Sequence, residues 1–529
     1  MILLLFWRDD RFHPRGGGGT AMADRLEFEI DVELETGLIT GHAEVPGLIE
    51  AFRQTGTAAV IDREIKLKSR KRGLSASEMV ESLLAMWAAG GERAEDLDQF
   101  RQDKALARLL GHELPAAQTA RDFLAQFHAE DLPLLQEGKS SVPAESVPLL
   151  SLAKANAELV LDMQCRRPVK TATLDVDATV IACDKRAAKR AYDGNRGYQP
   201  VLALWAEQDV IVADEFRDGN VPAGSGNRRV VEKALAALPG GIDKIYLRGD
   251  SALYEHELMR WLDEQAIGYA ITADMSSQLA ECIAALPEDH WKADQPEADA
   301  IREWAEVNYL PSDGIWKKDA VSPRRYLAIR IRPRQGELLR DGNRVRHFCI
   351  VTNRSDPQAG SGLELIRWHR HKAGTIEHAH DVLMNELAGA ALPSQKFGAN
   401  AAWLRLNVIL YNLPSAFKRV GLQARRPTRG ISYRQTQTAT LLAAQHRRQG
   451  RPPCPRDPPA LHQGDRSSPR RSAANPLRPQ TPRLSRGLRS LPCSCPELLD
   501  SAASNSSEFF QPHIPGSSSC RDRQHQGRR

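Results

Sequence analysis

Three acidic side chains in separate segments have the chemical type and placement needed for metal-assisted chemistry. Asp177 lies in "TLDVDATV" (173–180), Asp250 ends "YLRGD", and Glu377 lies in "AGTIEHAHD". Carboxylate oxygens are the ligands that hard divalent cations such as Mg²⁺ and Mn²⁺ prefer. Three converging carboxylates can bind two such ions, which activate the attacking water or 3′-hydroxyl and the leaving oxygen of a phosphoryl displacement. We therefore take Asp177, Asp250 and Glu377 as candidate catalytic and metal-binding residues.

Each of these acids also has a purely structural interpretation. Asp250 is suited to a turn that ends a strand, and Glu377 is suited to the first turn of a helix, where the helix dipole favours an acid. For either residue alone, the structural interpretation is the stronger one. Their occurrence together, on a strand and helix order that can bring them close, favours a functional site.

The stretch "TLDVDATV" carries a second acid, Asp175, on the same side of its strand as Asp177. Apolar and polar residues alternate through 173–180, as in a β-strand whose successive side chains point to opposite faces. Aspartate is disfavoured in strands, and two like charges on one face repel. We expect Asp177 to be the metal ligand, with Thr179 on the same face, and Asp175 to support it, although a direct ligand role for Asp175 stays open. A divalent cation would relieve the repulsion, so the metal-free strand is expected to be a weak point.

The elements that must position these acids follow the order βββαβαβ. The strands are predicted in "TATLDVDATVIAC", "YQPVLALWAE", "DVIVADEFRDGN", "DKIYLRGD" and "GYAITA", and the helices in "NRRVVEKALAALPG" and "YEHELMRWLDEQA". This order predicts the α/β class, with an RNase H-like mixed sheet core built from residues 169–273 and 354–424. In such sheets the strand ends present the functional groups.

Further segments flank this core. Residues 24–168 are predicted as a helical DNA-binding domain, in which Ser75 and Glu78 form a capping box and Gly90 and Gly91 end the same helix. Residues 274–353 are predicted as an inserted β-rich subdomain. Its tryptophans, Trp291, Trp304 and Trp316, are expected to pack in its interior, with stacking on a flipped DNA base as the alternative.

Basic residues indicate where a nucleic acid would bind. A cluster lies between Glu64 and Gly73, and we expect its members to contact DNA phosphates, with a solvated connector as an equal alternative. The residues in question are Lys66, Lys68, Arg70, Lys71 and Arg72. Arg248, Arg370 and Lys372, which lie close in sequence to the candidate acids, are further predicted DNA contacts.

Composition restricts the class of protein only loosely. The 529 residues include 72 basic and 67 acidic ones, a net charge of +5 that permits a nucleic-acid partner without requiring one. The absence of a long apolar run predicts no membrane association, and the scattered cysteines of the core predict a reducing, cytoplasmic location. Residues 1–23 are predicted to be a disordered arm, with Met22 as an alternative start. Residues 425–529 are rich in Pro, Arg and Ser and are predicted to be disordered, or the product of a shifted reading frame.

Four motifs together resemble the DDE transposases of bacterial insertion sequences. They are "TLDVDATV", "DGN" (218–220), "YLRGDSALY" and "GTIEH…NEL…NAAWLRLNVILYNL", and the resemblance covers about residues 24–421, in the branch with a β-rich insertion before the glutamate. It implies an RNase H-like catalytic core with Asp177, Asp250 and Glu377 as its acids, and two Mg²⁺ or Mn²⁺ ions. It also implies binding to terminal inverted repeats and target double-stranded DNA, a homodimer in a synaptic complex, and cut-and-paste cleavage and strand transfer.

The sequence departs from the superfamily pattern Tyr-x2-Arg-x3-Glu-x6-Lys around the glutamate. With Glu377 as the anchor, the three other positions hold Arg370, Ala373 and Met384. Lys372 and Arg370 are candidate replacements for the missing cations. Loss of a basic residue at Met384 and the unusual tail leave open a catalytically impaired remnant that only binds DNA. A different RNase H-like nuclease is the third alternative.

The histidines around Glu377 raise the question of a zinc site. His378 and His380 are two positions apart on a predicted helix and project about 200° apart, so they cannot chelate one ion. We expect His369, His371, His378 and His380 to be structural or DNA-facing residues.

Overall fold

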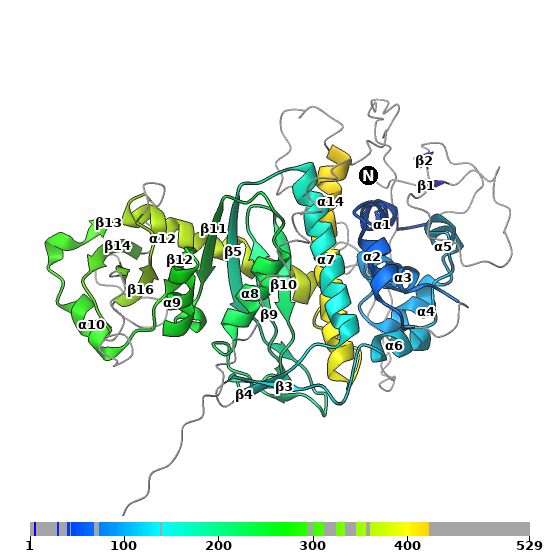
Figure 1. The fold of residues 1–529 in the computed structure, drawn as a ribbon, viewed down its shortest axis with the longest axis horizontal. Coiled ribbons are helices and arrows are strands. Elements are labelled where there is room, and N and C mark those ends of the chain that lie inside the picture. Colours follow the sequence, from blue (N-terminus) through cyan, green and yellow to red (C-terminus); the bar gives the residue numbers. More distant parts are fainter. Residues whose placement is uncertain are drawn as a thin grey trace, which may run out of the picture. The chain divides into compact units, whose positions relative to one another are not determined.

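The fold was derived from a computed structural model (Figure 1). It describes residues 5–6, 29–30, 40–42, 44–67, 73–137, 140–294, 300–311, 324–333, 345–355 and 360–422. Strands β1 (Leu5–Phe6) and β2 (Glu29–Ile30) pair with each other in an antiparallel manner. Several predictions lie outside the described residues: the DNA contacts Lys68, Arg70, Lys71 and Arg72, the packing of Trp316, and the state of residues 425–529.

Short helices occupy the chain between residues 45 and 125. They are α1 (Val45–Gln54), α2 (Thr57–Glu64), α3 (Ala76–Ala88), the 3₁₀ turn η1 (Ala94–Asp96), α4 (Leu97–Phe100), α5 (Lys104–Leu110) and α6 (Ala117–Ala125). The predicted capping box of α3 is confirmed. The Ser75 N–H donates to Glu78 Oε2 at 2.6 Å, and the Glu78 N–H donates to Ser75 Oγ at 3.1 Å. These bonds satisfy two of the backbone donors that a helix start leaves free.

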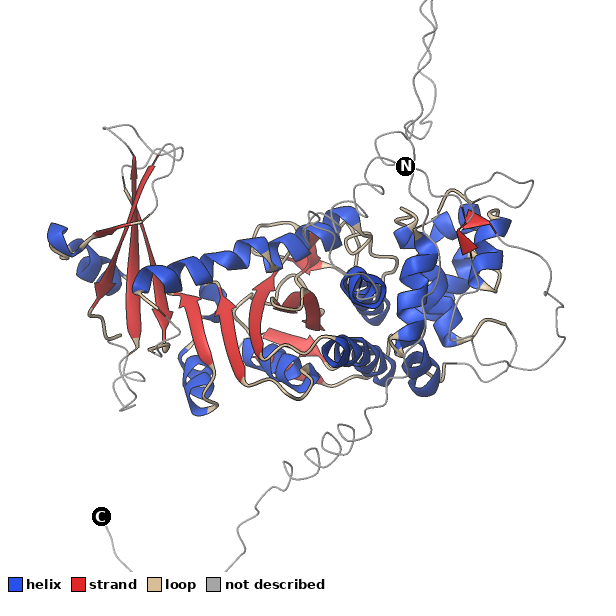
Figure 2. Ribbon diagram, turned by 90° about the horizontal axis from the view of Figure 1, so that it is seen from above, coloured by secondary structure: helices blue, strands red, loops and turns tan. Residues whose placement is uncertain are grey.

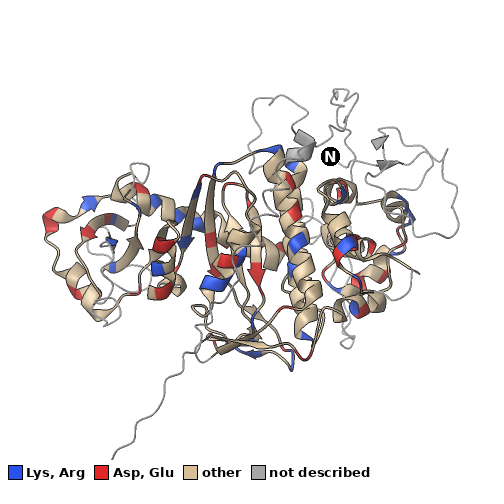
Figure 3. Cartoon of the chain, in the orientation of Figure 1, with Lys and Arg blue, Asp and Glu red and all other residues tan. Residues whose placement is uncertain are grey.

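A long helix, α7 (Val147–Arg166), joins these helices to the sheet. It follows the antiparallel pair β3 (Leu134–Glu137) and β4 (Ser140–Pro143) and begins at Ser146, whose Oγ accepts from the Leu149 N–H. Acidic and basic residues are interspersed along its outer side (Figure 3). In one such pair, Arg166 Nε lies 2.6 Å from Asp162 Oδ2. Its other side, which includes Leu152 and Leu159, is buried.

The central element is a nine-stranded mixed sheet with the order β10-β9-β5-β11-β12-β16-β15-β14-β13. Its first five strands and their connections are β5 (Thr171–Ala178), β9 (Val201–Trp205), β10 (Val210–Glu215), α8 (Asn227–Ala237), β11 (Lys244–Gly249), η2 (Ser251–Leu253), α9 (His256–Glu264) and β12 (Gly268–Thr272). The strands β5, β9 and β10 form an antiparallel meander, and β11 runs parallel to both β5 and β12. The predicted order βββαβαβ is confirmed, and the core is RNase H-like.

The β-rich insertion continues this sheet and does not form one of its own. Its elements are α10 (Ser277–Ala284), η3 (Glu288–His290), β13 (Lys292–Ala293), β14 (Ala300–Val307), β15 (Arg325–Pro333) and β16 (Arg346–Thr352). Strand β16 pairs antiparallel with β12, so Val351 lies opposite Ile271. The pairing is physically reasonable because it satisfies the backbone groups that β12 would otherwise expose at an edge. Trp304 packs in the interior against α12 residues, as expected for an insertion tryptophan.

A small three-stranded sheet lies between β5 and β9 in the chain and was not predicted. Its strands are β6 (Ile181–Ala182), β7 (Lys189–Arg190) and β8 (Arg196–Tyr198), in the order β6-β8-β7. Strands of two or three residues are too short to show a period in the sequence. This sheet separates the first strand of the core from the second by about twenty residues of chain.

Helices cover both faces of the core strands (Figure 2). The segment after the insertion comprises α12 (Gly362–Arg370), η5 (His371–Gly374), α13 (Ile376–Asp381), the π-helical turn η6 (Val382–Glu386) and α14 (Phe397–Leu422). Helix α13 packs on β5 and β9, and α12 packs on β12 and β14. Helix α8 packs on β9 and β10, and α9 packs on β12.

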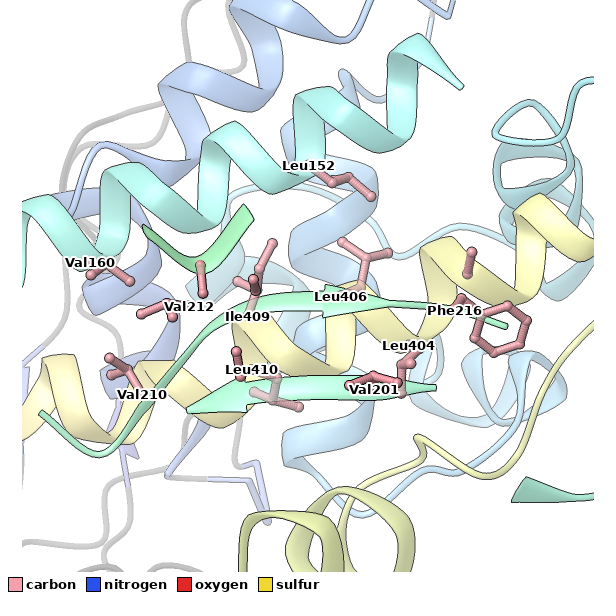
Figure 4. Close-up of a cluster of buried hydrophobic side chains, with 14 of the residues drawn as sticks. Leu152, Val160, Val201, Val210, Val212, Phe216, Leu404, Leu406, Ile409 and Leu410 are labelled. Atoms are coloured by element: carbon pink, nitrogen blue, oxygen red, sulfur yellow. The ribbon is translucent and has the colours of Figure 1, made fainter. Parts of the chain in front are cut away.

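The alternation of side chains along β9 shows how the two faces are filled. Leu202 and Leu204 point toward α13 and cluster with Ile376 and Leu383. Val201 belongs to the other buried cluster (Figure 4), in which α7 and α14 pack against β10. Helix α14 is the predicted buried helix, and its residues from 399 to 416 are almost all shielded from solvent. Among the described residues, no helix is long and apolar enough to cross a membrane.

Candidate active site

Asp175 and Asp177 lie on the face of β5 that α13 covers. In the sheet register, Asp175 lies opposite Leu204 and Asp177 opposite Leu202. Directly paired residues of neighbouring strands point to the same face, and these two leucines pack under α13. The strand pattern seen in the sequence therefore turns both acids toward the helical segment that carries Glu377.

Asp175 is fully buried, and both of its carboxylate oxygens are occupied. Its partner in the register of β11 is Arg248, whose Nε lies 2.6 Å from Oδ1 and whose Nη2 lies 2.7 Å from Oδ2. The Thr375 hydroxyl also donates to Asp175. A bidentate pair of this kind is strong and geometrically specific. Asp175 therefore holds β5, β11 and the start of α13 together, which is a supporting position and not that of a metal ligand.

The placement of Arg248 corrects one prediction. We expected Arg248 to contact DNA, but its side chain is only 3% exposed. Besides Asp175, the guanidinium donates to the Trp368 carbonyl at 2.5 Å and lies over the Trp368 ring, 5.2 Å from its centroid. The reason is the strand register, which places Arg248 opposite a buried carboxylate that requires a cation.

Asp177 and Asp250 stand at the ends of two neighbouring parallel strands. Val176 of β5 pairs with Gly249 of β11, and each acid is the next residue along the chain, so Asp250 directly follows the last residue of β11. Asp250 accepts the Ala252 N–H at 3.0 Å, which fixes the turn after β11. Burial raises the pKa of Asp250 above its ordinary value, the negative charge of Asp177 raises it further, and Lys372 opposes both effects. The two carboxylates therefore share one electrostatic environment.

Lys372 joins Glu377 to this pair. Its Nζ lies 3.1 Å from Asp177 Oδ2 and 3.9 Å from Glu377 Oε1. The lysine side chain is 10% exposed, whereas that of Glu377 is 54% exposed and free to reorient. We call Asp177, Asp250 and Glu377 the acid cluster. The Lys372 ammonium thus pairs with Asp177 and Glu377, and its charge also acts on Asp250, although the three acids come from three separate parts of the chain.

The acid cluster offers the donor chemistry that a divalent cation requires. Among the described residues, no group of three His, Cys, Asp or Glu side chains is already arranged to hold a metal ion. The Lys372 ammonium instead supplies positive charge between Asp177 and Glu377. The three carboxylates are oxygen donors of the kind that divalent cations prefer, and the raised pKa of Asp250 reflects its burial and the nearby charge of Asp177.

Two histidines support the site from the helical segment. His369 Nε2 lies 2.9 Å from the Gly249 carbonyl, next to Asp250. Burial lowers the pKa of His369 to about 4, so its neutral ring donates to that carbonyl. Burial, together with the charge of Lys372, lowers the pKa of His380 to about 4. His378 is exposed while His380 is buried, so the two project to different sides of α13 and do not form a chelating pair.

The remaining predicted DNA contacts are dispersed. Lys66 is exposed at the end of α2 and donates to the Asp62 carbonyl. Arg370 Nη1 lies 2.5 Å from Asp294 Oδ2, so this arginine joins α12 to the insertion. Met384 lies in the π-helical turn and packs against the apolar interior. Of the two candidate replacement cations, the structure brings Lys372 to the acid cluster and engages Arg370 elsewhere.

Sequence reasoning missed Thr375 and Trp368, which complete the surroundings of Asp175 and Arg248. No sequence signal identifies them, because their contacts depend on how α12 and α13 lie across the sheet. It also missed the small sheet of β6, β7 and β8. In that segment, the many Lys and Arg residues of "DKRAAKRAYDGNRG" (184–197) could have indicated a basic surface.

The chain is similar to known proteins in two comparisons. A family model described as "Transposase DDE domain group 1" matches residues 28–443. A cryo-EM structure of the piggyBac transposase synaptic complex with hairpin DNA aligns with a TM-score of 0.41 and 11% sequence identity, covering 89% of this chain and 87% of that one. No curated protein matches the chain.

Proposed function

This chain belongs to the Transposase DDE domain group 1 family and is a DDE transposase, and from this premise we propose that it mobilises a bacterial insertion sequence. In this proposal it binds the terminal inverted repeats of the element, cleaves DNA at the ends, and joins them to target DNA by a cut-and-paste route. It would act as a homodimer in a synaptic complex at the nucleoid. Residues 24–168 are proposed to recognise the repeats.

We assign the chemistry to the acid cluster. Members of the family normally use divalent metal ions, and we propose two Mg²⁺ or Mn²⁺ ions held by Asp177, Asp250 and Glu377. When bound, such ions polarise the attacking and leaving oxygens of a phosphoryl displacement. The chain itself fixes Asp177 and Asp250 at adjacent strand ends, while Glu377 approaches from α13 with a side chain free to turn toward them.

The observation that carries the proposal is that Asp177 and Asp250 follow paired positions of neighbouring strands, while Lys372 pairs with both Asp177 and Glu377. Packing alone does not require one largely buried lysine to be shared by two carboxylates from distant segments, because burying a charged group is costly. The bidentate pair of Asp175 and Arg248 stabilises this arrangement, because it joins the two strands and the helical segment that carry the acid cluster. Lys372 partly neutralises it in the absence of another cation.

The proposal is tested with the full chain and a labelled duplex that ends in the inverted repeat of the element. Short inverted repeats bracketed by a direct duplication in the DNA flanking the gene identify that substrate. Cleavage at the repeat end in Mg²⁺, abolished by Asp177→Asn, Asp250→Asn or Glu377→Gln while DNA binding persists, supports it.

Two other outcomes contradict the proposal in different ways. Repeat binding without cleavage in either Mg²⁺ or Mn²⁺ identifies an impaired remnant that acts only by binding DNA. Cleavage of hybrids or junctions irrespective of the repeat sequence identifies a different RNase H-like nuclease.

A further inference from the structure

The small sheet formed by β6, β7 and β8 exposes positive charge close to the acid cluster in the chain. It begins at Ile181, four residues after Asp177, and returns to the core at β9. Residues 184–196 contain five basic and two acidic side chains. Arg186, Arg190 and Arg196 are exposed, and we call these three the arginine face. None of the three forms a salt bridge with any described residue.

Two members of the arginine face lie directly opposite each other. In the register of β7 and β8, Arg190 pairs with Arg196. Like charges in directly opposed positions destabilise a strand pair. The Arg196 guanidinium donates to the Ala188 and Arg186 carbonyls at 3.2 and 3.3 Å, so neutral oxygens orient it and its charge remains uncompensated. Fold stability alone does not account for this pairing, whereas an anion bridging the two guanidinium groups does.

The turn between β7 and β8 presents an aromatic ring beside these arginines. Tyr192 is 83% exposed. Its turn is closed by the Ala191 N–H, which donates to the Asn195 carbonyl at 2.8 Å, and by Gly194, whose φ of 85° suits glycine. Asp193 accepts two hydrogen bonds from Asn195, each 3.0 Å long. The turn is thus well defined, yet it leaves a large ring in solvent.

The sheet is anchored firmly in the core despite its exposed surface. Ile181 and Tyr198 are almost completely buried, and Tyr198 packs against Phe216 with a centroid distance of 4.8 Å. The Thr179 N–H donates to the Pro200 carbonyl at 3.1 Å, which closes the base of the small sheet next to Asp177. The arginine face is therefore held in a constant position relative to the strand end that carries this acid.

We propose that the arginine face binds the sugar–phosphate backbone of DNA beside the acid cluster, and that Tyr192 stacks on an unpaired base of the same DNA. This inference rests on the proposed function, and it names a DNA-binding surface outside the helical region and outside the acids. Paired guanidinium groups suit phosphate oxygens, and an aromatic ring beside cations suits single-stranded DNA at a cleaved end.

The test measures the affinity of the full chain for a repeat-end duplex with a single-stranded flank, by fluorescence anisotropy at several salt concentrations. Arg190→Ala/Arg196→Ala is expected to weaken binding by about 10-fold and to reduce the salt slope by about 2, because each phosphate contact contributes about 0.9. Tyr192→Ala is expected to weaken binding of this DNA about 5-fold or more, and Tyr192→Phe to retain it.

The matched control is Arg228→Ala/Arg260→Ala, which removes the same charge from two partly exposed arginines that already pair with Glu232 and Glu257. Its affinity should stay within about 2-fold of the unaltered chain. An equal loss of affinity in both double variants would show that only net charge matters, and would overturn the inference. An unchanged salt slope in Arg190→Ala/Arg196→Ala would overturn it as well. Equal binding by Tyr192→Ala and the unaltered chain would overturn the part assigned to the ring.

Two readouts separate this inference from misfolding and from the proposed function. Removing one of two opposed arginines relieves repulsion, so Arg190→Ala should have a Tm no lower than the unaltered chain, and the single variants keep the test valid if the double variant unfolds. If the arginine variants bind DNA normally while Asp177→Asn abolishes cleavage, the inference fails and the proposed function stands. If they lose affinity although the unaltered chain cleaves no DNA, the inference stands and the proposed catalysis fails.

Discussion

Lys372 donates a hydrogen bond to Asp177 across 3.1 Å, although 195 positions separate the two residues in the chain. The same Nζ lies 3.9 Å from Glu377, so one ammonium group joins the first strand of the core to the helical segment after the insertion. Positive charge is therefore already present at the acid cluster. The stability of this region should depend on how that charge is balanced.

Lys372→Met should destabilise the metal-free protein by about 2 kcal/mol, because a largely buried carboxylate loses its charged hydrogen-bond donor. Urea unfolding measures the loss, and added Mg²⁺ should restore more stability to this variant than to the unaltered chain. The control is Lys170→Met, which removes an exposed partner of Asp243 and should cost less than about 0.5 kcal/mol. A loss no larger than that of the control would contradict the position given to Lys372.

Asp175→Asn should cost about 3–5 kcal/mol, because it leaves the Arg248 guanidinium buried without a compensating charge. A double-mutant cycle with Arg248→Met should give a coupling energy of at least about 1 kcal/mol. The exposed i,i+4 pair of Arg228 and Glu232 supplies the reference cycle, with a coupling of about 0.5 kcal/mol. Additive effects of the two buried substitutions would show that the pair does not fasten β5 to β11.

Asp250→Asn should stabilise the metal-free protein. Burial and the charge of Asp177 raise the pKa of Asp250, so the folded state binds a proton more tightly than the unfolded state. The unaltered protein therefore loses stability as pH rises from the ordinary pKa of 3.8 through the raised one, and Asp250→Asn lacks this loss. Thermal melts from pH 4 to pH 7 should show a stability difference that widens with pH. A difference independent of pH would contradict the electrostatic account of this acid.

His112 should make the stability of the helical region fall as pH rises. Burial lowers its pKa, but the hydrogen bond and charge of Glu81, 3.3 Å away, outweigh burial and raise it overall. Its stabilising contribution is complete below the ordinary pKa of 6.5 and is lost as pH rises through the raised value. In His112→Gln, the fall of Tm between pH 6 and pH 9 should be smaller than in the unaltered chain. Parallel pH profiles for the two proteins would refute this.

Local sequence patterns were sufficient for most elements of the core and for choosing the three acids as candidates. The alternation around Asp177, the turn after Asp250 and the capping box at Ser75 each depend on neighbours in the chain. The order βββαβαβ then restricts which strand ends meet. The elements of the core follow the predicted order and Lys372 pairs with Asp177 and Glu377, while the assignment of Asp177, Asp250 and Glu377 as catalytic residues stays a prediction.

Features set by register between distant segments were not accessible in this way. From the sequence, Arg248 is expected to be an exposed cation. The pairing of β11 with β5 places it opposite Asp175 instead. The insertion reads as a separate subdomain until β16 pairs with β12. The strands of the small sheet are too short to show periodicity, so Arg190 and Arg196 became neighbours only in the structure.

The central claim is that the acid cluster cleaves DNA, and single-turnover cleavage of a labelled repeat-end duplex tests it most directly. The full chain should cut at the repeat end in Mg²⁺ or Mn²⁺ and not in EDTA. Asp177→Asn, Asp250→Asn and Glu377→Gln should each reduce the rate by at least about 10³-fold without weakening DNA binding. Cleavage that survives loss of any one of these carboxylates, or that proceeds unchanged in EDTA, would contradict the account.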